Sequence, residues 1–470
     1  MNKVKKDIPI LSVYLLGFTI LAMALALFQP LADTPPLYAN PPDEYARYLI
    51  PQYICKHGTL PTGLETEVRI PGYGTSYALY NIFPYIVQGY LMRFVNLFTD
   101  SEIMLLYTAR TVNVCFGTFM AVMVYLISLE LFSDRRFRWL FCFAVMYLPE
   151  NIFIHSYVNT DSCCLLATAM MIYALIRGYR EGFKTFNCLW MCAGIILCAL
   201  SYYNAYGYIL SCIMLFVTYY IKSDKGHLQY DWRQMLKKGI FISVIVLLGI
   251  SWWFVHKYIV LDGDFLGFAT NNKLAELYAI DKVNPLTSQT YQKMGYTVWQ
   301  MIRERNTCEM AFRSFIAAYG SMAIYSSDWL YFAYKVLLIT GIAGVFYWLL
   351  NRKFFTKTRR QLSGKEMFFH LNMLFCIFMP IILMIYYAYA MDYQNQGRYV
   401  LPSLIPLMYY IVKGLEKLSS IRFGKYTLPR PLINVCLALC FLLIIGGTIE
   451  MVIFRTIPIC MRAGMVLLPE

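Results

Sequence analysis

Residues 8–28 of the chain are IPILSVYLLGFTILAMALALF, and residues 40–61 are NPPDEYARYLIPQYICKHGTLP. The first stretch is apolar over 21 residues, which as a helix is long enough to cross the ~30 Å hydrocarbon core of a bilayer. The second stretch places two adjacent carboxylates, an arginine and a histidine shortly after it. Together they predict a membrane-embedded chain with polar chemistry at one membrane surface.

The composition of the whole chain also favours a membrane protein. Of 470 residues, 59% are hydrophobic and 14% are charged, whereas soluble domains carry about a quarter charged residues. The net charge of +14 does not indicate a nucleic-acid partner, because the cations cluster in short loops between apolar blocks. The 14 cysteines form no CxxC pair and lie mostly inside apolar blocks. We therefore expect a single all-α polytopic membrane domain over residues 1–470.

Apolar blocks of about 20 residues recur along the chain and predict about eleven transmembrane helices. They cover residues 8–28, 104–132, 138–157, 162–178, 187–202, 205–221, 239–259, 329–350, 367–390, 399–416 and 432–454. A twelfth candidate is residues 79–98. We expect it to lie on the membrane surface as an interfacial helix interrupted by Pro84.

The distribution of cations predicts the orientation of these helices. Lys3, Lys5 and Lys6 place the N-terminus in the cytoplasm by the positive-inside rule. If the chain has eleven spans, every loop predicted to be cytoplasmic is basic, as the rule requires. If residues 79–98 also spanned the membrane, all of these basic loops would face outward and the rule would fail. We therefore expect an external C-terminus and two long extracytoplasmic loops, residues 29–103 and 260–328.

The first outer loop carries an acidic motif. Asn40 and Pro41 are typical of a helix start, which would put Asp43 and Glu44 in the first turn. Asp43 could complete a capping box, or act as a general base at the rim of a membrane-facing cleft with Arg47 as its partner. Adjacent helical residues point about 100° apart, so the two candidate catalytic carboxylates cannot serve one atom equally.

Two further motifs place acids at the outer surface. VNTDS holds Asn159 and Asp161 where two predicted helices meet, and His155 precedes them. Asp161 could cap the next helix, orient a sugar or bind a cation, and His155 could be a ligand or a buried, hydrogen-bonded histidine. LDGDFLG holds Asp264 in a DxD spacing, which fits either a turn or metal-dependent sugar transfer. A divalent metal ion is therefore a possible cofactor.

QNQGRYVLPSLIP, residues 394–406, is the most informative C-terminal stretch. Arg398 begins a predicted span at the depth of a lipid head group. It could anchor the helix by snorkelling, or bind a phosphate through its planar guanidinium. Gln396 and Arg47 are further candidates for binding the phosphate donor, and Gly397 would let a ligand approach the backbone.

In this order the motifs resemble those of GT-C-type glycosyltransferases, which include protein mannosyltransferases and the aminoarabinose transferase of lipid A. Within that superfamily the chain most resembles an uncharacterised family of bacterial polytopic proteins. The matching pieces are PPDE at residues 41–44, the turn at 159–161, WW at 252–253 with GD at 263–264 and LG at 266–267, SFIAAYG at 314–320, and QGRY at 396–399 with LP at 401–402 and Pro406. The chain departs from its relatives at Tyr45, where they often have histidine or arginine.

The resemblance implies a transferase that takes a sugar from a polyprenyl-phosphate donor. The acceptor would be extracytoplasmic, such as a cell-surface polysaccharide or a glycolipid. Asp43 maps onto the aspartate near the reaction centre and Asp161 onto the second-loop acid; some relatives hold a metal ion there and others do not. The protein would be a multi-pass protein of the bacterial cell membrane with its active site facing outward, and a single direct displacement would invert the anomeric centre.

Two other functions fit a polytopic chain of this kind. One is a flippase or transporter for lipid-linked saccharides, and the other is an O-antigen-type polysaccharide polymerase, which would join whole repeat units. A flippase should place ionisable residues deep in its spans, whereas here the acids gather in the predicted outer loops.

The predicted topology can be tested by labelling single cysteines in a variant that lacks the natural cysteines. Cysteines at positions 135 and 359 should react only after the membrane is permeabilised, because both positions lie in predicted cytoplasmic loops. Positions 43, 161 and 398 are predicted to lie on the outer side of the membrane. External labelling at position 359 would contradict the eleven-helix topology.

Overall fold

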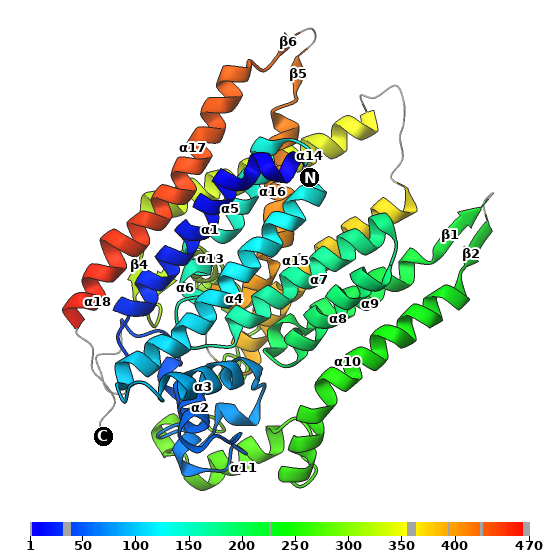
Figure 1. Ribbon diagram of the computed structural model, residues 1–470. Coiled ribbons are helices and arrows are strands. Elements are labelled where there is room, and N and C mark those ends of the chain that lie inside the picture. The colour runs from blue at the N-terminus through cyan, green and yellow to red at the C-terminus, as the bar shows by residue number, and fades with distance from the viewer. Residues whose placement is uncertain are drawn as a thin grey trace.

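The computed structural model describes residues 2–31, 39–224, 227–354, 363–392, 395–423 and 426–463. Within these residues the chain is almost entirely helical (Figure 1). The α-helices are α1 (Asn2–Phe28), α2 (Glu44–His57), α3 (Phe83–Val95), α4 (Glu102–Leu131), α5 (Arg135–Met146), α6 (Pro149–Ile154), α7 (Asp161–Glu181), α8 (Thr185–Ala199), α9 (Tyr206–Tyr219), α10 (Trp232–Val260), α11 (Phe268–Tyr278), α12 (Val298–Glu304), α13 (Thr307–Ile316), α14 (Asp328–Phe354), α15 (Gly364–Ala390), α16 (Leu404–Leu418), α17 (Arg430–Ile449) and α18 (Ile457–Ala463).

Short elements complete the described chain. The 3₁₀ segments are η1 (Thr66–Val68), η2 (Tyr77–Leu79), η3 (Tyr203–Ala205), η4 (Asp281–Val283) and η5 (Gly397–Ser403), and a π-helical segment, η6 (Glu450–Thr456), joins α17 to α18. The strands pair as three antiparallel hairpins: β1 (Ile221–Asp224) with β2 (His227–Tyr230), β3 (Ala318–Tyr319) with β4 (Ile324–Tyr325), and β5 (Arg422–Phe423) with β6 (Tyr426–Thr427).

The chain is a multi-pass membrane protein. Among the described residues, seven helices are long and apolar enough to cross a membrane: Lys6–Phe28, Glu102–Leu131, Asp161–Glu181, Trp232–Val260, Asp328–Leu350, Gly364–Ala390 and Arg430–Arg462. The other four predicted spans coincide with shorter helices: α5 with α6, α8, α9, and η5 with α16. The count of eleven and the orientation therefore stay predictions.

Three predicted segments differ from the structure, and in each the reason is a proline. Residues 138–157 are not one helix, because Leu148 adopts the extended conformation that a following proline favours, and α6 begins at Pro149. Residues 399–416 begin as the 3₁₀ segment η5, which contains Pro402. In residues 79–98, Pro84 does not interrupt a helix: it lies in the first turn of α3, where its missing N–H costs nothing.

The helices differ in how deeply they are buried. In α7, 89% of the most apolar stretch is buried, whereas in α10 only 11% is. Apolar side chains such as Leu248 and Phe332 are instead exposed on the outside of the bundle. Such a surface is unfavourable in water but suits contact with lipid tails, so α10, α14 and α17 form the outer layer and α4 and α7 the centre.

The helices α14 and α16 pack backbone to backbone. A Cβ atom added at Gly414 would overlap the carbonyl oxygen of Gly341, and one added at Gly344 would overlap the backbone of Gly414. Small residues that allow helices to approach closely are typical of membrane interiors. This contact positions α16 and hence η5, which directly precedes it.

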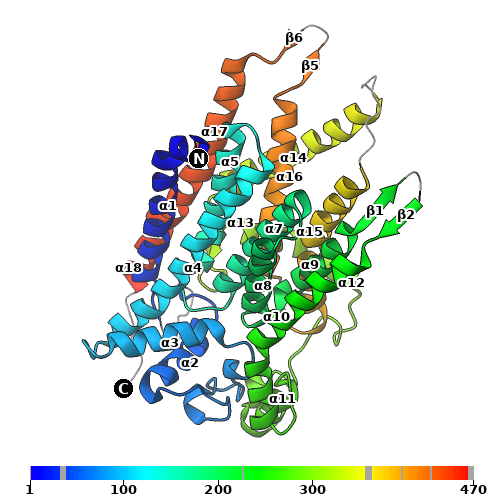
Figure 2. The same cartoon turned by 45° about the vertical axis from the view of Figure 1, so that its right-hand side comes forward.

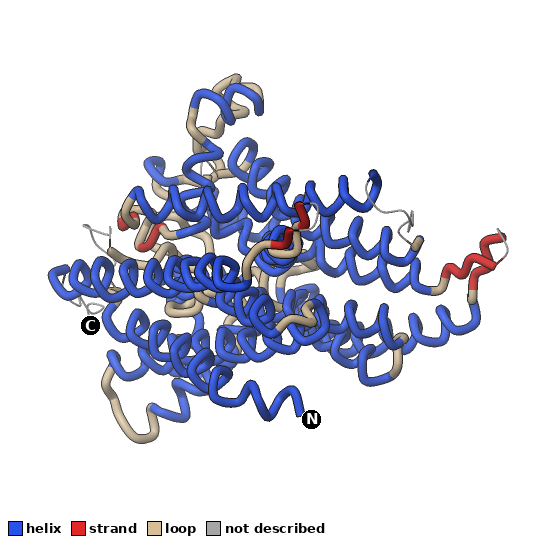
Figure 3. The backbone as a smooth tube through the Cα atoms, turned by 90° about the horizontal axis from the view of Figure 1, so that it is seen from above, coloured by secondary structure: helices blue, strands red, loops and turns tan. Residues whose placement is uncertain are grey.

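The two predicted sets of loops lie at opposite ends of the bundle. Helices α2, α3 and α11, from the predicted outer loops, gather at the end that is lowest in Figures 1 and 2, whereas the N-terminus and the hairpins β1–β2 and β5–β6 lie at the other end. Viewed from above, the β1–β2 hairpin projects beyond the helices (Figure 3). Arg359, in another predicted cytoplasmic loop, lies outside the described residues.

Candidate active site

Asp43 is the residue before α2, not a member of its first turn as predicted. Its backbone is left-handed, with φ 61° and ψ 5°, and its side chain makes no capping hydrogen bond. Helix α2 begins only at Glu44, because residues 41–43 form a turn in which the N–H of Glu44 donates to Pro41. The capping-box interpretation is therefore wrong. This conformation is uncommon for residues other than glycine, and aspartate is one of the few that adopt it at low cost.

The Asp43 carboxylate pairs with Arg398, which lies 355 residues later in η5. Arg398 Nη2 is 3.0 Å from Asp43 Oδ2 and 3.2 Å from the hydroxyl of Tyr399. The Arg398 side chain is 6% exposed, whereas that of Asp43 is 37% exposed. The ion pair is therefore buried on the arginine side and open on the carboxylate side.

Two arginines at this site have hydrogen-bond donors to spare. Arg398 Nε and Nη1 and Arg47 Nε are buried and have no hydrogen-bond partner in the described structure. Arg47 Nη1 donates to Thr160 and Tyr85, at 3.1 Å and 3.4 Å, and its guanidinium lies 4.7 Å from the centre of the Tyr77 ring. A buried donor without a partner costs about 1–3 kcal/mol, so an anion that accepted from these groups would be stabilised.

Arg398 lines two small cavities. The first is lined by Asp161, Cys164, Leu165, Tyr202, Arg398, Leu401 and Pro402. The second is lined by Pro42, Glu150, Phe153, Ser314, Ala318, Gly320, Met322, Gln396 and Arg398. The structure thus brings together Asp43, Arg47, Asp161, Gln396 and Arg398, which come from three separate motifs.

The charges around Asp43 control its protonation. Burial would raise the pKa of Asp43, but the positive charges of Arg398 and Arg47 and the hydrogen bond from Arg398 outweigh this effect and hold the pKa below its usual value. Asp43 is therefore ionised at neutral pH.

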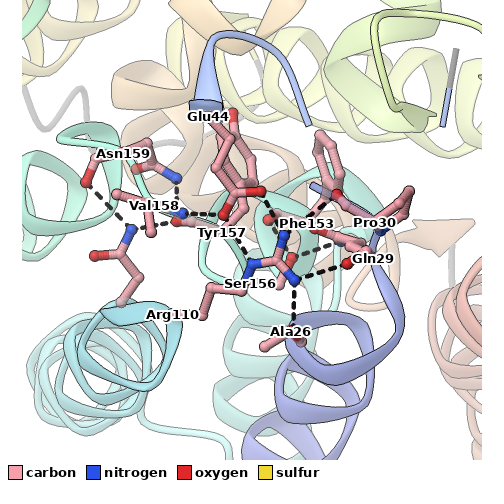
Figure 4. A network of polar contacts seen from close by, with 11 residues as sticks. Ala26, Gln29, Pro30, Glu44, Arg110, Phe153, Ser156, Tyr157, Val158 and Asn159 are labelled. Carbon is pink, nitrogen blue, oxygen red and sulfur yellow. Dashed lines mark hydrogen bonds and ion pairs between the residues drawn. The ribbon is translucent and has the colours of Figure 1, made fainter. Parts of the chain in front are cut away.

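Glu44 points into the protein and forms a buried ion pair with Arg110 of α4 (Figure 4). Arg110 Nε and Nη2 lie 2.8 Å and 2.6 Å from the two carboxylate oxygens, and the N–H of Val158 donates to the same carboxylate at 2.8 Å. Both side chains are completely buried. Arg110 also donates to three backbone carbonyls at and just beyond the end of α1, those of Ala26, Gln29 and Pro30. Glu44 thus joins α2 to α4, to the end of α1 and to the turn before α7.

Asn159 and His155 are also held inside the protein. The Asn159 amide donates to the carbonyls of Ile154 and Tyr157, and its oxygen accepts from the N–H of Ser162 at 2.9 Å, in the first turn of α7. His155 Nδ1 lies 2.5 Å from Ser162 Oγ, and its ring packs edge-on against Phe18. Both side chains are fully buried, so they shape the turn that carries Asp161.

Asp264 lies away from both cavities and caps α11. Its two oxygens accept from the N–H groups of Gly267 and Thr270 at 2.9 Å and 2.7 Å. Burial would raise its pKa, but these hydrogen bonds lower it below the usual value. Among the described residues no three His, Cys, Asp or Glu side chains come together to hold a metal ion. The candidate ligands Asp161, Asp264 and His155 therefore do not fit a shared metal centre.

Position 397 requires glycine because the backbone there packs closely against helix α13. The N–H of Gly397 donates to Ser314 Oγ at 2.6 Å, and a Cβ atom there would overlap backbone atoms of Ala311 and Phe315 in α13. The space that was predicted to admit a ligand is occupied by α13. This contact joins the SFIAAYG and QGRY motifs and fixes the backbone that precedes Arg398.

Sequence reasoning missed Arg110 and Glu150. Both are ionisable residues inside apolar blocks, at residues 104–132 and 138–157. Ionisable residues inside membrane segments are rare and usually have a partner or a function. A search for isolated charges within the spans would have found both residues.

Comparison with known proteins identifies the fold. No protein-family model and no curated protein matches the sequence. The Archaeoglobus fulgidus oligosaccharyltransferase, tethered with an acceptor peptide containing the NVT sequon, is 14% identical with a TM-score of 0.53, covering 97% of this chain and 56% of that one. Its apo form is 15% identical with a TM-score of 0.52, covering 94% and 55%. Arabinofuranosyltransferase AftD from Mycobacteria is 9% identical with a TM-score of 0.48, covering 94% and 27%.

This chain therefore spans little more than half the length of the oligosaccharyltransferase. The similarity extends over nearly all of this chain and shows that it has the GT-C fold. The resemblance that the motifs predicted is confirmed at the level of the fold.

The two neighbouring carboxylates should respond differently to loss of charge. Glu44→Gln leaves the charge of Arg110 buried without its partner, so it should destabilise the protein by about 3–5 kcal/mol. Asp43→Asn should destabilise the protein less, because the Asp43 side chain is 37% exposed, so water reaches this ion pair, and asparagine also tolerates the left-handed backbone. Thermal unfolding in detergent measures both variants, and an unchanged midpoint for Glu44→Gln would contradict the structural importance of the Glu44–Arg110 pair.

Proposed function

We propose that the protein is a membrane glycosyltransferase that moves a sugar from a polyprenyl-phosphate donor to an extracytoplasmic acceptor. The observation that carries the proposal is the Asp43–Arg398 pair, in which a half-exposed carboxylate adjoins a buried guanidinium with two unused donors. The GT-C fold supports it, because an oligosaccharyltransferase has that fold. The acceptor would be a cell-surface polysaccharide or a glycolipid, and the site would face outward from the cell membrane.

The donor phosphate would bind at Arg398. The parallel donor pairs of a guanidinium are Nε with Nη2 and Nη1 with Nη2. A phosphate bound in the favoured bidentate geometry would therefore take one unused donor of Arg398 together with Nη2, which in the free protein contacts Asp43. The charge of Arg47, with its own unused Nε, would add to the attraction. Gln396 lines the neighbouring cavity and would contact the same ligand.

Asp43 would act as the general base. Its carboxylate accepts the proton of an acceptor hydroxyl while the hydroxyl oxygen forms a bond to the anomeric carbon of the sugar. The bond between that carbon and the phosphate oxygen breaks, and the phosphate leaves with the electron pair, stabilised by Arg398. One direct displacement of this kind inverts the anomeric centre.

Donor binding would also activate the base. In the free protein Arg398 lowers the pKa of Asp43, which makes Asp43 a weak proton acceptor. A phosphate at Arg398 would offset that positive charge and add a negative one nearby, so the pKa of Asp43 would rise towards the working pH. The base would then be strongest only when a donor is present.

The remaining site residues would support this centre. Asp161 faces Arg398 across the first cavity and would orient the donor. Glu44, Asn159, His155 and Asp264 would hold the backbone, because each of them already makes hydrogen bonds to other parts of the protein. The steps above use side chains alone; in the part of the chain that the structure describes, the acids at the site form no group of three metal ligands.

The decisive experiment is incubation of the purified protein with a set of polyprenyl-phosphate hexoses and an envelope extract as acceptor. Release of polyprenyl phosphate together with labelled product would support the transferase, with Asp43→Asn as the matched control. Movement of intact lipid-linked sugar across a vesicle membrane, without release, would indicate a flippase instead. Joining of whole repeat units would indicate a polymerase.

Arg398→Lys should weaken donor binding. Lysine keeps the positive charge but loses the planar fork, so we expect a loss of roughly 1–3 kcal/mol, the scale of a hydrogen bond to a charged group. The measurement is the affinity for polyprenyl-phosphate hexose in detergent or nanodiscs. If Arg398→Ala bound the donor as tightly as the wild type, Arg398 would be only a membrane anchor.

Asp43→Asn should keep the fold and lose turnover by a factor on the order of 10²–10⁴, because asparagine cannot accept the proton. Donor binding should persist, so the loss should appear in kcat.

In the wild type, kcat/KM should fall only at low pH, because the pKa of Asp43 is lowered in the free protein. The fall in kcat should begin at higher pH, because the bound donor raises that pKa. Near-normal turnover of Asp43→Asn would refute the base assignment and make Asp161 the next candidate.

A further inference from the structure

Glu150 is a buried carboxyl group beside the reaction centre that the mechanism above does not use. It lies in α6, is 2% exposed, and lines the second cavity together with Arg398 and Pro42, the neighbour of Asp43. Its Oε2 accepts from the N–H of Ala318 at 2.9 Å, in the β3–β4 hairpin. A carboxyl group in a protein interior is costly unless its hydrogen-bonding capacity is used. The contact with Ala318 uses only part of that capacity.

The carboxyl of Glu150 and the guanidinium of Arg398 share this cavity without forming an ion pair. In the described part of the chain, Arg398 pairs with Asp43 and Glu150 pairs with no cation. The donor of Arg398 that the phosphate leaves unused can only donate, whereas the carboxyl of Glu150 accepts when ionised and can also donate when protonated. A group placed between them must therefore accept from Arg398, and a group that can both accept and donate suits Glu150 in either protonation state.

We propose that this cavity receives a hydroxyl group of the transferred sugar, held between Arg398 and Glu150. A hydroxyl both accepts and donates, so it satisfies both residues at once. Phe153, Pro42 and Met322 also line the cavity, which has room for about one water-sized group and therefore fits a hydroxyl rather than the whole sugar ring. Glu150 is then a specificity-determining residue that selects a sugar with a free hydroxyl at that position. The inference rests on the proposed function, because it takes the lipid-linked sugar as the ligand.

The test compares two lipids, polyprenyl-phosphate hexose and bare polyprenyl phosphate, on the full-length protein. Glu150→Ala should weaken binding of the hexose lipid on the order of tenfold, the effect of losing one hydrogen bond to a charged group. Binding of bare polyprenyl phosphate should not change, because it has no sugar hydroxyl. Glu150→Gln keeps an oxygen for Ala318 and for the sugar, so it should recover part of the loss. Asp264→Asn, a carboxylate change outside the cavity, is the control and should affect neither lipid.

Deoxy analogues of the hexose sharpen the test. Removal of the hydroxyl that Glu150 contacts should weaken binding to the wild type but have little further effect on binding to Glu150→Ala. The effects of removing two groups that contact each other do not add, because either change alone already removes the contact. That analogue would identify the hydroxyl that Glu150 contacts.

The possible failures can be told apart. If Glu150→Ala weakened both lipids equally, Glu150 would act by anchoring the β3–β4 hairpin, and the inference would be overturned while the proposed function stood. If additive losses were seen for every deoxy analogue, the contact with a sugar hydroxyl would likewise be excluded. If the wild type bound neither lipid, the proposed function itself would fail, and this inference with it.

Discussion

The buried ion pair between Glu44 and Arg110 is the interaction on which the candidate site depends. Through it α2 is fixed to α4, to the end of α1 and to the turn before α7. A buried ion pair of this kind contributes little net stability over an apolar replacement, but it is satisfied in only one arrangement of its neighbours. Because Glu44 is held in that way, the preceding residue, Asp43, is turned out of the helix and towards Arg398. The two adjacent acids thus have separate partners: Glu44 pairs with Arg110 inside the protein, and Asp43 pairs with Arg398 at the candidate site.

At the proposed site two anions, the Asp43 carboxylate and the donor phosphate, compete for the guanidinium of Arg398. In the free protein Asp43 occupies one nitrogen of Arg398 and leaves two others unused. A bidentate phosphate would take one of those two together with the nitrogen that Asp43 occupies, and so would reduce the hold of the guanidinium on Asp43. In the proposed reaction this competition sets the order of events without a conformational change. The Asp43 carboxylate becomes a competent base only after the donor, which carries the leaving group, has bound. Glu150 lines the second cavity together with the same arginine, and in the further proposal it selects which sugar binds there.

The sequence predicted the fold well because hydropathy and loop charge are local properties. Every predicted span coincides with a helix or a pair of helices, and the motifs around Asp43, Asp161 and Arg398 do converge. The errors are of two kinds: prolines reshaped three of the predicted segments, and contacts between distant segments were not foreseen. The partner of Glu44 lies 66 residues away in α4, and Gly397 is explained by α13 rather than by a ligand. Neither contact leaves a local pattern. Glu150 was overlooked because a single acid in an apolar block does not alter the hydropathy of that block.

The left-handed backbone at Asp43 limits which residues evolution can place there. Among side chains with a Cβ atom, only asparagine and aspartate adopt this conformation at low cost, and glycine adopts it freely. Of these three, aspartate alone carries a proton acceptor. Backbone and charge therefore select the same residue independently, and glutamate would satisfy only one of the two. In a lineage that no longer needed the reaction, drift at this position would lead to asparagine or glycine, which preserve the turn, before it led to the chemically closer glutamate.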